Sequence, residues 1–226
     1  MNQILHLVLE TPGAKAYDIL QEATKEDRPL PQFYFPNPSP SCKSKEHTWS
    51  LGDNGCDQPL SFNDPLHSSE VFIILSHQIS LADQLEAFVR FQQTNEQIIM
   101  GRILLFIHSP VLLEGIDSFQ DWVDAVVHFT DAMLFTDRTN ENASAIKTLQ
   151  QRYTTLRYPL ENYILSKKNN PWTRILDPTP RRLSHIFDGI ELLEPEDYPE
   201  NDRYLKKLPT GERERTIPLI FKKVSI

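Results

Sequence analysis

The stretch VFIILSHQISLADQLEAFVRFQQTNEQIIMGRILLFIH, residues 71–108, decides the fold. Its two ends, 71–76 and 102–108, are apolar runs with the length of a buried strand. Between them, residues 80–94 carry apolar side chains at helical spacing, and Ser80 supplies a helix-capping hydroxyl. Because a strand–helix–strand unit places its two strands parallel in one sheet, the stretch predicts an α/β protein.

The same alternation continues on both sides of this unit. Apolar runs predict further strands at 3–9, 132–136 and 156–160, the last reaching Tyr163 at the farthest. Periodic patterns predict further helices at 14–25, 118–129 and 142–153. We therefore expect one α/β domain over residues 1–165, with an open, mostly parallel sheet flanked by helices.

Two segments lack this alternation. Residues 26–69 are rich in proline, and we expect a long loop or insertion there, with a hairpin at 49–56 that turns at Asp53-Asn54-Gly55. Residues 166–226 predict an extended C-terminal arm with one short helix at 181–188. The apolar residues 219–221 would anchor the arm, either on its own domain or on a partner chain.

Composition limits the classes of function. The chain has 226 residues, 39% of them hydrophobic, which is enough for a substantial core. Its net charge of −8 gives no attraction to polyanions, so we expect neither nucleic-acid nor membrane binding. The apolar runs are too short to span a bilayer, and only two cysteines are present. These features are typical of a cytoplasmic protein.

Polar and titratable side chains follow the predicted strands at the point where each strand ends. In a parallel sheet these ends meet at one edge, where ligands usually bind. The candidate catalytic residues there are Glu10, His77, His108 and Asp137, the carboxylates as acid or base and the histidines as metal ligands or proton carriers. The candidate cofactor-binding residues are Gly13, Lys15 and Arg138. The alternative is that polar residues begin wherever strands end, because loops are solvated.

The proline-rich segment contains Cys42, His47, Cys56 and His67, which are residue types that bind zinc. Their spacing fits no compact zinc motif and no C-x-x-C is present, so we expect no metal and two free thiols. A Cys42–Cys56 disulfide is not expected in the cytoplasm.

Two smaller groups are open to alternative interpretations. His128 and Asp131 could form part of a catalytic triad, but the sequence has no G-x-S-x-G elbow, and Asp131 could instead cap a turn. The arginines at 181–182 are expected to pair with acids such as Asp177 or Asp188, or to bind an anion on the surface. The aromatic residues 33–35 are expected to cover the domain's own core, with docking on a partner as the alternative.

The order of elements resembles that of the metal-chaperone branch of the P-loop GTPases, the type related to cobalamin-synthesis protein W. LVLETPGAKAYDIL (7–20) lies where that family has its first strand and phosphate loop. VFIILSHQISLADQLEAF (71–88) and WVDAVVHFTDAMLFTDRTN (122–140) are similar to its later strand–helix and helix–strand units. The resemblance covers residues 3–165 in order and pattern, and it implies a three-layer P-loop NTPase-like fold.

The nucleotide motifs of that family are degenerate here. In the pattern G-x-x-x-x-G-K-[ST], Lys15 is kept, but Leu9, Ala14 and Ala16 stand where the two glycines and the hydroxyl are required. The guanine motif N-K-x-D would fall at 136–139, which reads Thr-Asp-Arg-Thr, and the family's C-x-C-C metal motif is absent. Only seven glycines are present, although phosphate-binding loops depend on glycine.

The sequence therefore assigns no specific activity. The leading hypothesis is a degenerate P-loop-GTPase-like domain that does not hydrolyse nucleotide and acts as a binding or interaction module. Its contacts, with a second copy or another protein, would come from the proline-rich segment and the C-terminal arm. The alternative is a metal-assisted or acid/base hydrolase that uses the strand-end residues. Both hypotheses stay open at this point, and neither names a cofactor.

Overall fold

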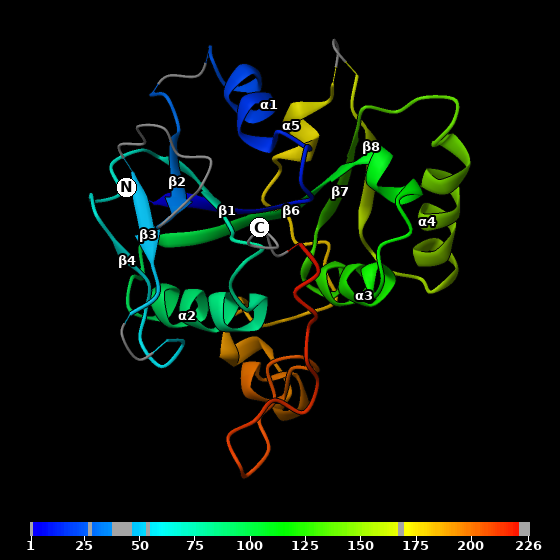
Figure 1. Ribbon diagram of the computed structural model, residues 1–226. Helices are drawn as coiled ribbons and strands as arrows, with labels where there is room; N and C mark the ends of the chain where they lie inside the picture. Colours follow the sequence, from blue (N-terminus) through cyan, green and yellow to red (C-terminus); the bar gives the residue numbers. More distant parts are fainter. Residues whose placement is uncertain (1, 27–28, 38–46, 53–54, 167–169, 222–226) are drawn as a thin grey trace.

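The computed structural model describes residues 2–26, 29–37, 47–52, 55–166 and 170–221 (Figure 1). These ranges form an eight-stranded sheet in the order β4-β3-β2-β5-β1-β6-β7-β8. The strands are β1 (Gln3–Glu10), β2 (Gln32–Pro36), β3 (Thr48–Ser50), β4 (Ser61–Phe62), β5 (Glu70–Ile74), β6 (Ile98–His108), β7 (Ala132–Thr136) and β8 (Glu161–Ile164). Neighbouring strands are parallel except β3 and β4, which are antiparallel.

Helices cover both faces of the sheet. They are α1 (Ala16–Ala23), α2 (Leu81–Gln93), α3 (Phe119–Phe129), α4 (Ala143–Thr155) and α5 (Trp172–Ile175). One core contains residues of α1 and α5, and the larger core on the other face contains residues of α2, α3 and α4. The predicted open, mostly parallel three-layer α/β fold is confirmed. No helix in the described part of the chain is long and apolar enough to cross a membrane.

The central strands are apolar because both of their faces are buried. Every residue of β7 is buried, with Met133 and Phe135 in the larger core and Ala132 and Leu134 in the smaller one. Side chains of a strand alternate between its two faces, so a strand covered on both sides needs a continuous apolar run. This requirement explains why the apolar runs in the middle of the chain predicted the strands correctly.

The prediction of a loop or insertion at 26–69 was incomplete, because this segment supplies three strands. β2 lies between Pro31 and Pro36 and pairs in parallel with β5, with Phe33 opposite Phe72. Tyr34 belongs to the larger core and its neighbour Phe35 to the smaller one, as alternation along a strand requires. The aromatic residues therefore cover the domain's own core. The surrounding prolines hid the strand, although proline is compatible with strand ends.

Two other local predictions need correction, and a third is described only in part. The last strand lies at 161–164 and not at 156–160, because α4 continues to Thr155 and ends in a turn where Arg157 has φ 57°. Residues 181–188 form no helix, only a turn closed by a hydrogen bond from Asp188 N–H to the His185 carbonyl. In the predicted hairpin, Gly52 and Gly55 form an antiparallel bridge, whereas 53–54 lie outside the described residues.

The C-terminal arm crosses from one face of the sheet to the other. After α5 it passes to the face of α2 and α3, forms a small lobe below α2 with the 3-10 turns η2 (Ile190–Leu192), η3 (Pro195–Asp197) and η4 (Pro199–Asn201), and then returns toward the sheet (Figure 1). Its anchoring side chains are buried in the larger core: Ile186, Phe187, Tyr204, Leu205 and Ile217. The arm therefore completes the core of its own chain.

A buried ion pair joins the arm to the sheet. The Asp131 carboxylate, fully buried before β7, accepts hydrogen bonds from the Ile103 amide at 2.7 Å and from Arg182, whose guanidinium is also buried. Arg182 donates in addition to Asp188, as expected for this arginine. Asp131 and His128 do not pair with each other, because His128 bonds instead to Asp202 at 2.8 Å. The proposed catalytic role for His128 and Asp131 is therefore not supported by the geometry.

We predict that Asp131→Ala lowers the free energy of unfolding by about 3–5 kcal/mol, because it leaves the buried Arg182 guanidinium with Asp188 as its remaining carboxylate and removes the acceptor of the Ile103 amide. Urea denaturation followed by circular dichroism measures the change. The exposed Asp197 is the matched control, and Asp197→Ala should stay within about 0.5 kcal/mol. Equal effects of the two substitutions would show that the buried pair does not anchor the arm.

Candidate functional site

The turn between β1 and α1 is short and tied to the neighbouring strand. It contains only residues 11–15, because β1 ends at Glu10 and α1 begins at Ala16. Leu9, the position of the first motif glycine, is buried within β1. The Thr11 amide donates to the Phe106 carbonyl at 2.9 Å, and the Thr11 hydroxyl accepts from the His108 amide at 2.8 Å. The Ala14 amide donates back to the Thr11 carbonyl at 3.1 Å. These bonds hold the turn close to the end of β6.

A carboxylate of the chain itself occupies the N-terminus of α1. Glu10 Oε2 accepts a hydrogen bond from the amide of Ala16, the first residue of the helix, at 2.9 Å. Lys15, just before it, has the left-handed backbone conformation, with φ 57°. A helix N-terminus attracts anions through its unpaired amides and its dipole. Here the Glu10 carboxylate takes that position.

The His108 side chain packs on the same turn. Gly13 has φ 88°, and a Cβ atom at Gly13 would stand 2.9 Å from Cδ2 of the His108 ring. His108 Nδ1 lies 3.1 Å from Asp137 Oδ2, and the His108 side chain keeps 26% of its surface exposed. The imidazole therefore lies between the turn after β1 and the loop after β7.

An open groove of about 1330 Å³ lies between α1, the loop after β7 and the segment after β8. Its walls include Lys15, Asp137 and Arg138, with Trp172 at the start of α5. Asp137 has φ 51°, and its carbonyl is held by the Asn142 side chain at 3.1 Å. The groove combines positive, negative and aromatic side chains at the carboxyl ends of the strands.

A second, much smaller cavity lies on the other side of β1. Its volume is about 20 Å³, which is room for about one water molecule. Glu10 and His77 line it together with apolar side chains and with residues 217–219 of the C-terminal arm. Burial lowers the pKa of His77, so the neutral imidazole is favoured there.

The predicted strand-end residues therefore lie along one edge of the sheet but not in one pocket. Glu10 and His77 face the small cavity, and Lys15, Asp137 and Arg138 line the open groove. His108 pairs with Asp137, and Gly13 lies against His108. The edge was predictable because strand ends are visible in the sequence. The division into two spaces was not, because it depends on where the arm returns.

The four Cys and His residues of the proline-rich segment are not seen as one cluster. Cys42 lies outside the described residues, and Cys56 carries a free thiol. His47 Nδ1 lies 3.3 Å from Asp64 Oδ2, and His67 is exposed.

A different group that the sequence did not suggest brings Cys56 next to Asp83 and Glu86 on α2. Arg213 and Lys207 of the arm already neutralise these carboxylates, with Arg213 2.6 Å from Asp83 and 2.8 Å from Glu86. Partial burial alone would raise the pKa of Glu86, but the hydrogen bonds from Lys207 and Arg213 outweigh it and lower the pKa. Burial raises the pKa of the Cys56 thiol. The group is thus a salt-bridge network between arm and helix.

Comparison with known proteins identifies the fold. No protein-family model matches the chain, and no curated protein matches it. The Zn(II)-bound YjiA GTPase from E. coli is similar in structure, with a TM-score of 0.52 at 11% identity over 80% of this chain and 67% of that one. A Zn(II)-bound triple mutant of YjiA GTPase gives a TM-score of 0.51 at 13% identity with the same coverage. At such identities the match supports a distant P-loop GTPase fold and nothing more specific.

We predict that Gly13→Ala lowers the free energy of unfolding by more than Gly211→Ala does. Both glycines have nearly the same φ, 88° and 86°, so the backbone cost of about 1–2 kcal/mol is shared. Only at Gly13 does the new methyl group meet a side chain, the ring of His108, whereas Gly211 has open space. Urea denaturation of both variants measures the difference.

The double variant Gly13→Ala/His108→Ala separates the two costs. Without the ring, the alanine at position 13 should cost about as much as the one at 211, relative to His108→Ala alone. If Gly13→Ala is no more costly than Gly211→Ala in the native background, then His108 does not hold the turn in place.

Proposed function

We propose that this chain is a P-loop-GTPase-like domain that no longer hydrolyses nucleotide and works as an interaction module. The observation that carries the proposal is the hydrogen bond from Ala16 N–H to Glu10 Oε2 at 2.9 Å. A phosphate-binding loop works by pointing several free amides at one anion. In this turn the amides of Ala14 and Ala16 are already bonded inside the loop.

The charge and the shape of the turn after β1 also disfavour a bound triphosphate. A triphosphate at this position would have to displace the Glu10 carboxylate or lie beside it, and like charges at contact repel. The hydroxyl that would bind Mg²⁺ is replaced by the methyl group of Ala16, which is fully buried. The His108 ring fills the space next to Gly13. Lys15 is exposed and is the one motif residue that is kept.

The contacts of such a module would come from the proline-rich segment and the C-terminal arm. The arm exposes apolar side chains, among them Leu192 with 79% and Ile190 with 49% of its surface accessible. Partners would be a second copy of the chain or another protein.

We predict that the full chain shows no saturable binding of Mg²⁺-GTP or Mg²⁺-ATP with a Kd below about 1 mM, and no phosphate release. Isothermal titration calorimetry and a phosphate-release assay are the measurements.

Glu10→Ala should gain stabilisation by inorganic phosphate in thermal melts, because it frees the Ala16 amide. Asp18→Asn is the control, since it removes a charge from the first turn of α1 without freeing that amide. Micromolar nucleotide binding with turnover by the native chain would refute the proposal.

A second candidate function is acid/base hydrolysis at the edge of the sheet. It is favoured by the half-exposed pair His108–Asp137, in which a carboxylate at 3.1 Å orients the imidazole. Glu10 and His77 do not line the groove beside this pair. The residues that support the hydrolase are therefore His108 and Asp137, with Lys15 and Arg138 nearby.

For this second candidate, His108→Gln should reduce the hydrolysis of p-nitrophenyl esters and phosphates by about 100-fold or more. His185→Gln is a matched control, because His185 forms a similar pair with Asp188 at 2.8 Å on the arm. Release of p-nitrophenol is followed by absorbance. The same background rate for the native chain and both variants would eliminate the hydrolase.

A further inference from the structure

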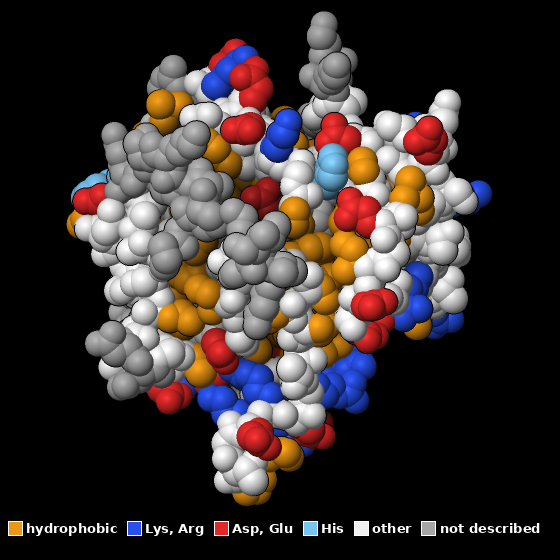
Figure 2. Space-filling model, viewed as in Figure 1, with side chains coloured by type: hydrophobic (Ala, Val, Ile, Leu, Met, Phe, Trp, Pro, Cys, Tyr) orange, Lys and Arg blue, Asp and Glu red, His pale blue; other side chains and the backbone are white. Residues whose placement is uncertain are grey.

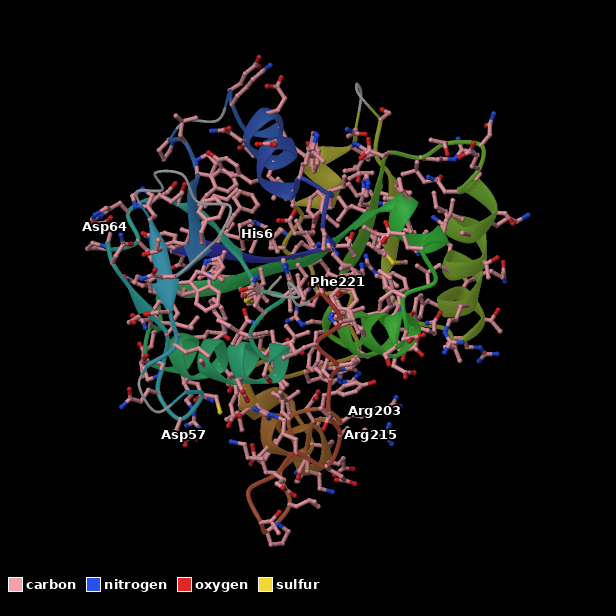
Figure 3. The ribbon with its side chains drawn as sticks, viewed as in Figure 1. His6, Asp57, Asp64, Arg203, Arg215 and Phe221 are labelled. Atoms are coloured by element: carbon pink, nitrogen blue, oxygen red, sulfur yellow. The ribbon has the colours of Figure 1, made fainter. Side chains whose placement is uncertain are left out.

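The last described part of the chain, residues 216–221, lies across the ends of α2 and α3 and is called the strap here (Figure 3, where Phe221 is labelled). Phe221 packs edge-on against Trp122 of α3, with ring centroids 5.1 Å apart, and contacts the rings of Phe119 and His77 at 6.3 and 6.2 Å. Ile217 is buried in the larger core. Both ends of the strap thus pack against the larger core.

The surface under the strap is called the seat and consists of Leu9, Leu75, His77, Leu81, Phe119 and Trp122. It lies at the carboxyl ends of β1 and β5, between α2 and α3. It is apolar apart from His77, and the small cavity that remains between seat and strap is also lined by the polar residues Glu10 and Ser76. Hydrophobic side chains also gather around this region in the space-filling view (Figure 2). The seat is therefore a largely hydrophobic surface that residues 216–221 of the same chain cover.

Side chains alone hold the strap in place. Among the residues that the structure describes, no hydrogen bond joins 216–221 to the rest of the chain. Only Ile217 is fully buried, and the residues from Pro218 to Phe221 keep part of their surface exposed. A segment with few buried contacts and no backbone hydrogen bonds opens at a much lower free energy than the core.

We propose that the seat is a peptide-binding groove in which the strap is an internal occupant, displaced by a partner segment of the same chemistry. That segment is an extended aliphatic–Pro–aliphatic–aliphatic–aromatic sequence, as in the strap's own Ile-Pro-Leu-Ile-Phe (217–221). Because the strap uses no hydrogen bonds to the seat, recognition depends on the spacing of the aliphatic and aromatic anchors. The inference gives a location and a partner class to the interaction module of the preceding section, and rests on that proposal.

The strap also prevents the seat from binding apolar segments of other proteins non-specifically. A tethered segment competes with any partner at an effective concentration of about 1 mM, so only a partner with better anchors displaces it. Proline lowers the entropy lost on docking, since it restricts the unbound segment. The seat is thereby protected from solvent until such a partner is present.

The test uses a fluorescein-labelled peptide with the sequence ERTIPLIF, residues 214–221, and the full-length chain. Fluorescence anisotropy should show binding to the Phe221→Ala chain at least about tenfold tighter than to the native chain, because the weakened strap competes less. Leu156→Ala, at an exposed site at the end of α4 and away from the arm, should bind like the native chain. A peptide with its phenylalanine changed to alanine should bind neither protein tightly.

Thermal melts verify that each variant is folded, and Leu219→Ala replaces Phe221→Ala should the latter unfold. Equal peptide affinity for native and strap variants, or no binding to either, would overturn the proposal. Light scattering tests for one further outcome, a concentration-dependent dimer that the peptide dissociates. Such a dimer would mean that the seat is occupied by the strap of a second copy. That result would also contradict the proposal of a foreign partner. The nucleotide titration is independent of these results, so failure of the strap proposal and failure of the non-hydrolysing module are distinguishable.

Discussion

The structure depends on the need to cover both faces of its central strands. β1, β5, β6 and β7 carry apolar side chains toward both sides, so each face must be sealed from water. On one face, the eight residues of α1 and the four of α5 contribute to the seal. On the other face, α2, α3 and α4 are joined by buried residues of the C-terminal arm. The arm is therefore part of the core, and the Asp131–Arg182 pair fixes where it attaches.

The same constraint shapes the edge of the sheet where ligands bind in related folds. A helix N-terminus favours an anion whether that anion is a bound phosphate or a carboxylate of the chain. In this protein Glu10 is the last residue of β1, and its side chain reaches the first amide of α1. The amides of Ala14 and Ala16 are thus bonded within the chain, and the open groove lies beside Lys15, Asp137 and Arg138. The strap lies over the carboxyl ends of β1 and β5.

Sequence patterns located the strands that are buried on both faces, because such strands need uninterrupted apolar runs. They failed where proline and aromatic residues mix, as in β2, since a five-residue strand that follows Pro31 and ends in Pro36 resembles a loop. They also failed at 181–188, where Arg182 turns inward to a buried carboxylate instead of lying on a helix surface. Pairings between residues far apart in the chain, such as Asp83 with Arg213, leave no local signal.

The sequence by itself determined the α/β class, the order of the main strands and helices, and the absence of a G-x-x-x-x-G-K-[ST] pattern, because these depend on local periodicity and on residue types at fixed spacing. Only the tertiary structure decided that Glu10 closes the helix α1 terminus, that His108 meets both Gly13 and Asp137, and that the strap lies on Trp122. These contacts join residues brought together by the crossing of the chain over the sheet. Their geometry follows from packing, which no stretch of sequence specifies alone.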